Sequence, residues 1–176
     1  MKYRQGWTII ELLLVLAITS LLVGMAVPPF TAMLDNYRAS SKLNQIYHLF
    51  NYSRQQAVIH GQFVTVCPSR NRRQCIGDWT APIIAFIDSN TDEEINGDDR
   101  LLRELAFAGG SQGIEFRASS RRQFLQFKAS GVSNGIAGSL MICEKSHSLY
   151  KNKLVLSLTG RISLKNIDFS QSCRAP

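Results

Sequence analysis

The chain begins with an almost uninterrupted apolar stretch. Between Trp7 and Phe30 the only charged side chain is that of Glu11. A run of this length approaches the ~20 residues that cross a bilayer as a helix. A carboxylate in such a run costs about 2.5–3.5 kcal/mol on insertion scales, so Glu11 requires a partner. Pro28, near the end of the run, is expected to kink or loosen the predicted helix, because proline removes a backbone donor.

The helix is predicted to continue with a different periodicity. Apolar residues recur at spacings of three, four and seven at Leu43, Ile46, Phe50 and Ala57. These spacings place one apolar stripe on an amphipathic helix. His60-Gly61 predicts its end, because glycine favours the position after the last helical residue.

Beyond Gly61 the pattern changes to short β-type runs bounded by Gly, Asn or Ser. Eight runs are candidate strands: 63–67, 82–87, 101–107, 113–116, 124–128, 139–143, 153–158 and 161–165. The last two predict a hairpin that turns near Thr159-Gly160. The pattern therefore predicts an α+β protein, with a long N-terminal helix packed against an antiparallel β domain over 61–176.

Charge is distributed unevenly along a chain whose net charge is +7. Residues 117–176 hold ten Lys or Arg and two Asp or Glu, whereas residues 60–116 hold five and nine. Such asymmetry suggests a polyanionic partner, although a solvated basic face is the commoner meaning of a cationic cluster.

Four cysteines allow three disulfide pairings. Cys67 and Cys75 lie close together in the sequence, so we pair them, and Cys143 pairs with Cys173 by elimination. The N-terminal segment argues for export, and exported domains lie where disulfides persist. A zinc site is disfavoured because neither pair has the short CxxC spacing.

The residues around Glu11 form a specific motif. Gly6-Trp7-Thr8-Ile9-Ile10-Glu11-Leu12 follows a short basic leader and closely resembles the GFTLIEL signature of type IV prepilins and type II secretion pseudopilins. The resemblance implies that residues 1–6 are a leader peptide, that a prepilin peptidase cleaves after Gly6, and that the new amino terminus at Trp7 is methylated. Trp7 stands where the family usually has Phe. Glu11 is expected to pair with this amine on a neighbouring subunit, because opposite charges offset part of each other's desolvation.

Blocks of the β domain resemble one subgroup. TVCPS, CIGDW, AFIDSN, DDRLLRE, LMIC and LTGRI follow the order seen in the GspH/FimT/FimU pseudopilin family. The resemblance implies a pilin fold, in which a long N-terminal helix packs on a C-terminal antiparallel two-sheet β domain over 61–176. It also implies that the apolar first half of the helix, 7–30, forms the transmembrane or filament-core segment, and that the second half, 31–60, is amphipathic. Pilins commonly carry a helix-loosening proline at the position of Pro28.

The family resemblance implies a minor pilin of a type IV pilus. Expected partners are other major and minor pilins, the inner-membrane pilus assembly machinery and the prepilin peptidase. The precursor is expected in the bacterial inner membrane as a single-pass protein with its β domain in the periplasm, and then in the extracellular pilus, at or near the tip. Two alternatives stay open: a purely structural priming pilin, and a GspH-like pseudopilin of type II secretion.

The basic C-terminal third contains candidate DNA contacts. Residues two apart in a strand share a face, which groups Arg161 with Lys165 and groups Lys151 with Lys153 on the hairpin partner. Arg174 follows Cys173, and a Cys143–Cys173 bridge would hold it near the sheet. A cationic patch of this kind grips phosphates without reading sequence, so double-stranded DNA is a candidate partner.

One motif within this patch also resembles FimT-like members. These proteins carry a GRxR motif and bind DNA for uptake during transformation. Here Gly160-Arg161-Ile162-Ser163 has Ser163 in place of the second arginine, and Lys165, one step further on the same face, compensates in part. The competing interpretation is a solvated basic edge that discourages strand pairing.

The sequence does not indicate an enzyme. His48, His60 and His147 lie in no nucleophile or metal motif, and the GxSxG, HExxH and P-loop patterns are absent. No cofactor is expected.

One acidic stretch has the spacing of a calcium loop. Asp88, Asn90 and Asp92 match the D-x-[DN]-x-[DN] pattern, whose alternate oxygens can converge on one cation. Glu93, however, stands where an EF-hand loop needs glycine. We therefore favour an Asx-rich turn between two strands over a metal site.

Overall fold

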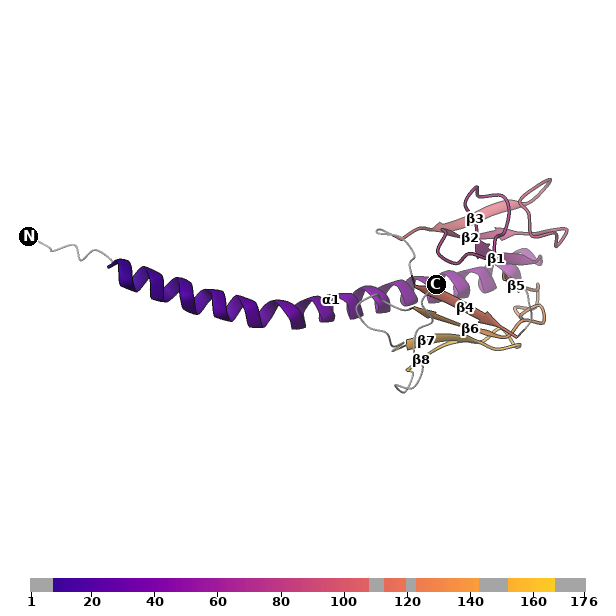
Figure 1. The fold of residues 1–176 in the computed structure, drawn as a ribbon. Helices are drawn as coiled ribbons and strands as arrows, with labels where there is room; N and C mark the ends of the chain where they lie inside the picture. The colour runs from indigo at the N-terminus through magenta and orange to yellow at the C-terminus, as the bar shows by residue number, and fades with distance from the viewer. Residues whose placement is uncertain (1–7, 108–112, 120–122, 143–151, 167–176) are drawn as a thin grey trace, which may run out of the picture. The chain divides into compact units, whose positions relative to one another are not determined.

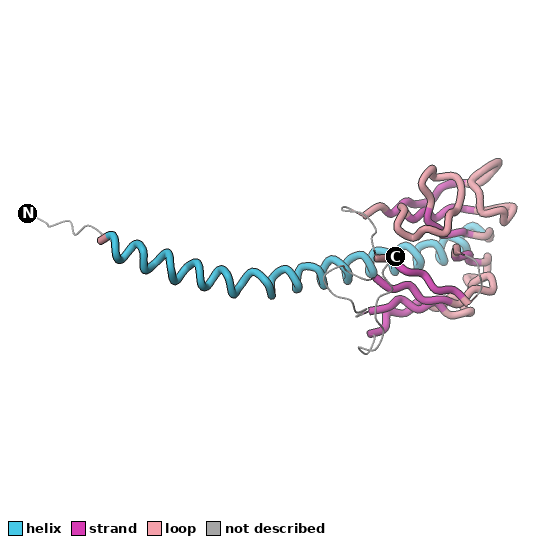
Figure 2. Tube along the Cα trace, in the orientation of Figure 1, coloured by secondary structure: helices cyan, strands magenta, loops and turns pink. Residues whose placement is uncertain are grey.

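The structure is a computed structural model that describes residues 8–107, 113–119, 123–142 and 152–166 (Figure 1). The chain divides into two compact units, Met1–Tyr37 and Arg38–Pro176, and each is described by itself. Helix α1 (Ile9–His60) supplies residues to both units, whereas all the described strands belong to the second (Figure 2).

In the first unit, α1 begins directly after Thr8. The Thr8 hydroxyl accepts a hydrogen bond from the backbone N–H of Glu11 at 3.3 Å, which is the geometry of a helix N-cap. Glu11 is thus the third residue of the helix, where a carboxylate also interacts favourably with the positive end of the helix dipole. The apolar pattern alone did not identify Thr8 as the helix cap.

The apolar side chains of this unit are exposed in the isolated chain from Ile9 to Val23. Among the described residues, no helix combines the length and the hydropathy that crossing a membrane requires. Pro28 lies inside α1. The loosening of the helix at Pro28 and the role of 7–30 stay predictions.

Sheet 1 of the second unit has the strand order β3-β2-β1-β5, and all its strand pairs are antiparallel. The strand bounds are β1 Val64–Pro68, β2 Ile83–Ile87, β3 Arg100–Leu105 and β5 Leu125–Phe127. Every residue of β1, β2 and β5 is buried. Side chains on one face of this sheet join the main core, and Ile84 and Phe86 on the other face form a smaller apolar cluster with Phe124 and Ile136.

Sheet 2 has the order β4-β6-β7-β8 and is also antiparallel. The strand bounds are β4 Ile114–Ala118, β6 Gly138–Ile142, β7 Asn152–Leu156 and β8 Ile162–Asn166. The turn between β7 and β8 spans residues 157–161.

The main core forms where α1 passes between the two sheets (Figure 1). Leu43, Ile46, Phe50 and Ala57, the predicted stripe, are all buried there, together with Leu49. Trp79 contacts two other aromatic rings of this core. Its ring centroid lies 6.5 Å from that of Phe50 on α1 and 4.6 Å from that of Phe116 on β4. Burying such side chains is worth about 1.5–3 kcal/mol each, so the stripe holds the helix in the β domain.

The predicted α+β fold with two antiparallel sheets is confirmed. Eight strands match the eight predicted runs to within a few residues, and α1 ends at His60 as predicted. Gly61 follows with a φ of 64°, the left-handed conformation common after a helix. One detail of the prediction was wrong: Arg161 lies in the turn before β8, not on the strand.

Candidate functional site

The outward face of sheet 2 carries the predicted cations of the hairpin. Leu154 and Leu156 of β7 are buried in the core, so Lys153, at an alternate position, points to the opposite face. Lys153 is the Cα partner of Lys165 on β8. Directly opposed side chains in an antiparallel pair have their Cβ atoms about 4.5–5.5 Å apart. The two lysine side chains therefore start from neighbouring positions on the outward face, where like charges opposite each other are unfavourable without an anion to neutralise them.

Arg161 stands in the β7–β8 turn, at the other end of the hairpin from this pair. Its backbone N–H donates to the Ser157 hydroxyl at 3.1 Å, and its carbonyl accepts from the Ser157 N–H at 3.0 Å. Because residues 157–161 form the turn, strand alternation does not determine which sheet face the Arg161 side chain takes. The Arg161 side chain is exposed.

Gly160 has a packing role in the same turn. Its φ is +77°, and a methyl group added to it would overlap the carbonyl oxygen of Gly131 in the turn after β5. Only glycine combines this φ with such a close backbone approach. The glycine of the Gly160-Arg161 motif therefore sets the position of the turn.

Sequence reasoning missed one cation of this face. Arg117 on β4 pairs with Ser139 on β6, and Ser139 pairs with Val155 on β7. Val155 in turn pairs with Ser163 on β8, so Arg117 lies on the same outward face as Lys153 and Lys165. Its guanidinium bonds the Glu115 carboxylate at 2.6 Å. The alternation of Glu115 and Arg117 was visible in the sequence, but only the pairing of β4 with β6 places them on this sheet face.

Several predicted site residues lie outside the described part of the chain: Gly6, Trp7, Cys143, Lys151, Cys173 and Arg174. Of the two expected disulfides, Cys67–Cys75 is present, with 5.5 Å between the Cα atoms. The proposals for the other residues stay predictions.

The acidic stretch after β2 is organised by Asp88. This carboxylate is fully buried, and it accepts hydrogen bonds from the Thr65 hydroxyl at 2.6 Å and from Gln126 Nε2 at 3.2 Å. The backbone N–H groups of Asp92 and Glu93 also donate to it. A buried carboxylate needs such donors, so Asp88 fixes the loop to β1 and β5.

Asp92 is likewise bonded by its own loop. Its carboxylate accepts from Asn96 Nδ2 at 2.6 Å, from Asn90 Nδ2 at 2.8 Å and from the Glu94 N–H at 3.0 Å. The hydrogen bond from the Asn96 side chain, followed by that from the Glu94 backbone, lowers the pKa of Asp92. Carboxylate oxygens of Asp88, Asp92 and Asp99 lie within 4.8 Å of one another. Because protein donors already use these oxygens, the geometry favours the Asx-rich turn, and we assign no metal.

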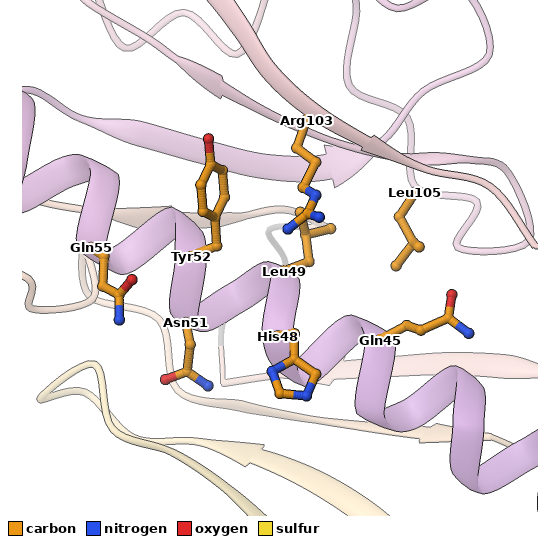
Figure 3. Close-up of a pocket in the computed structure, with 8 residues that line it drawn as sticks. All are labelled: Gln45, His48, Leu49, Asn51, Tyr52, Gln55, Arg103 and Leu105. Atoms are coloured by element: carbon orange, nitrogen blue, oxygen red, sulfur yellow. The ribbon is translucent and has the colours of Figure 1, made fainter.

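A groove of about 500 Å³ lies between α1 and β3 (Figure 3). It is lined by Gln45, His48, Leu49, Asn51, Tyr52, Gln55, Arg103 and Leu105. The Arg103 guanidinium lies over the Tyr52 ring at 5.3 Å from its centroid, a favourable cation–π contact. The described residues that line the groove include no carboxylate and no thiol.

Two known protein families match this chain. Residues 42–160, more than half of the chain, match the family described as type II transport protein GspH, and residues 1–27 match the prokaryotic N-terminal methylation motif. No curated protein sequence matches.

Three solved structures are similar. Two are crystal forms of the type IV minor pilin FimU of Pseudomonas aeruginosa, with TM-scores of 0.59 and 0.56 and identities of 18% and 19%. The alignments cover 81% and 77% of this chain and 99% of each FimU chain. The minor pseudopilin EpsH of Vibrio cholerae has a TM-score of 0.43 at 12% identity, covering 73% of this chain and 97% of its own. The FimU likeness shows the same fold.

Proposed function

The chain belongs to the GspH family, and we propose that it acts as a minor pilin of a type IV pilus. Family membership makes it a pilin-type structural subunit rather than an enzyme, and implies association with other pilins and with the pilus assembly machinery. We further propose how the protein is processed, where it lies in the filament and that it binds DNA.

Processing and assembly follow from the N-terminal motif. A prepilin peptidase removes residues 1–6 and the amine of Trp7 is methylated, which agrees with the match of 1–27 to the methylation motif. Before assembly, the apolar half of the helix anchors the precursor in the inner membrane with the β domain in the periplasm. Afterwards the subunit lies at or near the tip of the extracellular pilus.

DNA binding is supported by one observation above all, the register pair of Lys153 and Lys165 on the outward face of sheet 2. Arg161 adds an exposed cation in the turn at the other end of the hairpin. Cations held in this way neutralise phosphates and contact the DNA backbone without selecting a sequence. The bound DNA is therefore expected to be double-stranded and of any sequence.

A salt titration tests this part of the proposal. Full-length protein in detergent is titrated with duplex DNA at several salt concentrations, beside Arg161→Ala/Lys165→Ala. Each lost phosphate contact lowers the slope of log affinity against log salt by about one, so the variant should lose about two. Arg70→Ala/Arg73→Ala removes the same charge from the other sheet's loops and is the control. If both variants lost the same amount of slope, net charge alone would explain the effect. If the wild-type protein did not bind DNA, the DNA-binding proposal would be wrong.

The family match itself favours a second candidate, a pseudopilin of type II secretion, since the matching family is described as a type II transport protein. A purely structural pilin that primes assembly is the third. Deletion in the host separates them: loss of DNA uptake alone supports the DNA-binding role, loss of pili supports priming, and loss of secreted enzymes with intact pili supports the pseudopilin.

A further inference from the structure

Four large apolar side chains are exposed around the C-terminal end of α1. Val58 is 54% exposed and Ile59 69% exposed in the last turn of the helix. Val132, in the turn after β5, is 39% exposed, and Leu158, in the β7–β8 turn, is 55% exposed. We call these four residues the end patch.

The three elements that carry the end patch are packed together. A methyl group added to Gly131 would meet Val58 Cγ2 at 3.1 Å, and one added to Gly160 would meet the Val132 Cα atom at 3.3 Å. Arg54 also donates from Nε to the carbonyl oxygen of Gly131 at 2.8 Å. The helix end and the two turns are therefore held together, so the apolar residues that they expose are grouped in one region rather than scattered over the surface.

The elements that carry the end patch are positively charged, whereas the acidic loop after β2 lies on the His60 side, where Arg100 contacts His60 at 3.2 Å. Arg54, Lys128 and Arg161 stand on the same three elements, and Lys128 belongs to the turn that carries Val132, since its N–H donates to the Val132 carbonyl at 2.9 Å. The segments 38–60, 123–142 and 152–166 contain no Asp or Glu. The patch is thus apolar at its centre and cationic along the side formed by Arg54 and the two turns.

We propose that the end patch is the docking surface for another pilin subunit of the same filament, whose contact surface presents apolar side chains next to carboxylates. An apolar centre with a polar, charge-complementary rim is the usual anatomy of a protein interface. This assignment uses the family's association with other pilins and does not depend on DNA binding.

Three other occupants fit less well. A second copy seated patch to patch would bring two cationic sides together, which is unfavourable. Anionic lipid would satisfy the charges, but the patch has none of the Trp or Tyr side chains that mark membrane interfaces. DNA phosphates would use the cationic side and leave Val58, Ile59 and Leu158 without a contact.

The test uses full-length protein in detergent and each of the other pilins of its own filament, purified separately. Val58→Ser/Leu158→Ser should weaken binding of one pilin about tenfold or more, as loss of interface anchors does. The control Leu101→Ser/Leu164→Ser changes two leucines on β3 and β8 that are 38% and 42% exposed, and it should leave that binding within about twofold. Ile59→Ser, the most exposed position, repeats the test if the double variant is unstable to heat.

Charge reversal identifies the partner's chemistry. Lys128→Glu should weaken the same pairing, and an Asp→Lys or Glu→Lys change in the partner's contact surface should restore it. The proposal is overturned if no pilin pairing responds to the patch variants. It is also overturned if they alter only self-association, only binding to phosphatidylglycerol vesicles or only binding to duplex DNA. Because the DNA titration leaves the apolar residues intact, the DNA-binding proposal can fail independently.

Discussion

Gly160 shows how a single backbone position controls the basic face. Its positive φ and its contact with the Gly131 carbonyl fix the turn in which Arg161 stands. The contact also ties this turn to the helix, because Gly131 accepts the hydrogen bond from Arg54. A side chain at position 160 would have to displace backbone, which a close-packed interior resists.

We predict that Gly160→Ala destabilises the protein by about 2–4 kcal/mol, from left-handed strain together with overpacking. Gly135→Ala is the matched control, because Gly135 has a φ of +73° but no atom within 4 Å of the added methyl group. Gly135→Ala should lower the free energy of unfolding by only about 1 kcal/mol, because it adds strain without overpacking. Denaturant unfolding of both variants measures the difference. Equal losses would mean that the Gly131–Gly160 contact does not constrain the turn.

The same residue marks a limit of sequence analysis. Gly160-Arg161 was interpreted through its resemblance to a DNA-binding motif, and the packing of Gly160 on Gly131 could not be anticipated, because the two residues are far apart in the sequence. Asp88 is a similar case. Its spacing to Asn90 and Asp92 indicated an Asx-rich loop, but its hydrogen bonds to Thr65 and Gln126 depend on strand pairing.

At the scale of elements, the disulfide loop supports the acidic loop. The Cys67–Cys75 disulfide closes a short loop. Gln74 in this loop forms an antiparallel bridge with Glu94 in the acidic loop after β2. The Ile95 N–H donates to the Arg73 carbonyl at 2.7 Å, and Gln74 Nε2 donates to the Glu94 carboxylate at 3.1 Å. The two loops are therefore expected to loosen together.

Removing the bridge tests this coupling. Cys67→Ala/Cys75→Ala should lower the free energy of unfolding by about 2–3 kcal/mol, since the closed loop is short. Amide hydrogen exchange should rise in residues 88–99 as well as in 67–75. Arg70→Ala, which breaks the exposed ion pair with Asp78, should change stability by less than about 1 kcal/mol. Faster exchange confined to 67–75 would show that the loops are independent.

The elements themselves were largely predictable. The stripe of Leu43, Ile46, Phe50 and Ala57 and the short β runs are local patterns that hydrophobic burial selects directly. The partners of each strand were not predictable. Arg117 was missed because β4 pairs with β6 rather than with its sequence neighbours, and Arg161 was placed on a strand because a run of alternating residues does not show where the turn ends.

At the scale of the whole molecule, the two units differ in what they bury. The second unit encloses its own core, whereas the apolar residues from Ile9 to Val23 are exposed in the isolated chain. Exposed apolar surface of this extent marks a contact with lipid or protein. The Glu11 carboxylate lies inside this segment, so the group that pairs with it determines which contact the first unit makes.

Two roles for Glu11 can be separated by substitution. If its charge pairs with the amine of a neighbouring Trp7, Glu11→Gln should abolish incorporation into the filament while insertion and leader cleavage continue. The cap would survive in this variant, because the Thr8 hydroxyl accepts from the backbone N–H of residue 11, not from its side chain. Thr8→Ala removes the cap at a loss of about 1 kcal/mol and should leave incorporation near normal. Immunoblots of sheared filaments and of membranes measure both variants. Normal incorporation of Glu11→Gln together with loss in Thr8→Ala would reverse the assignment, making the start of the helix, rather than the charge, the feature that assembly requires.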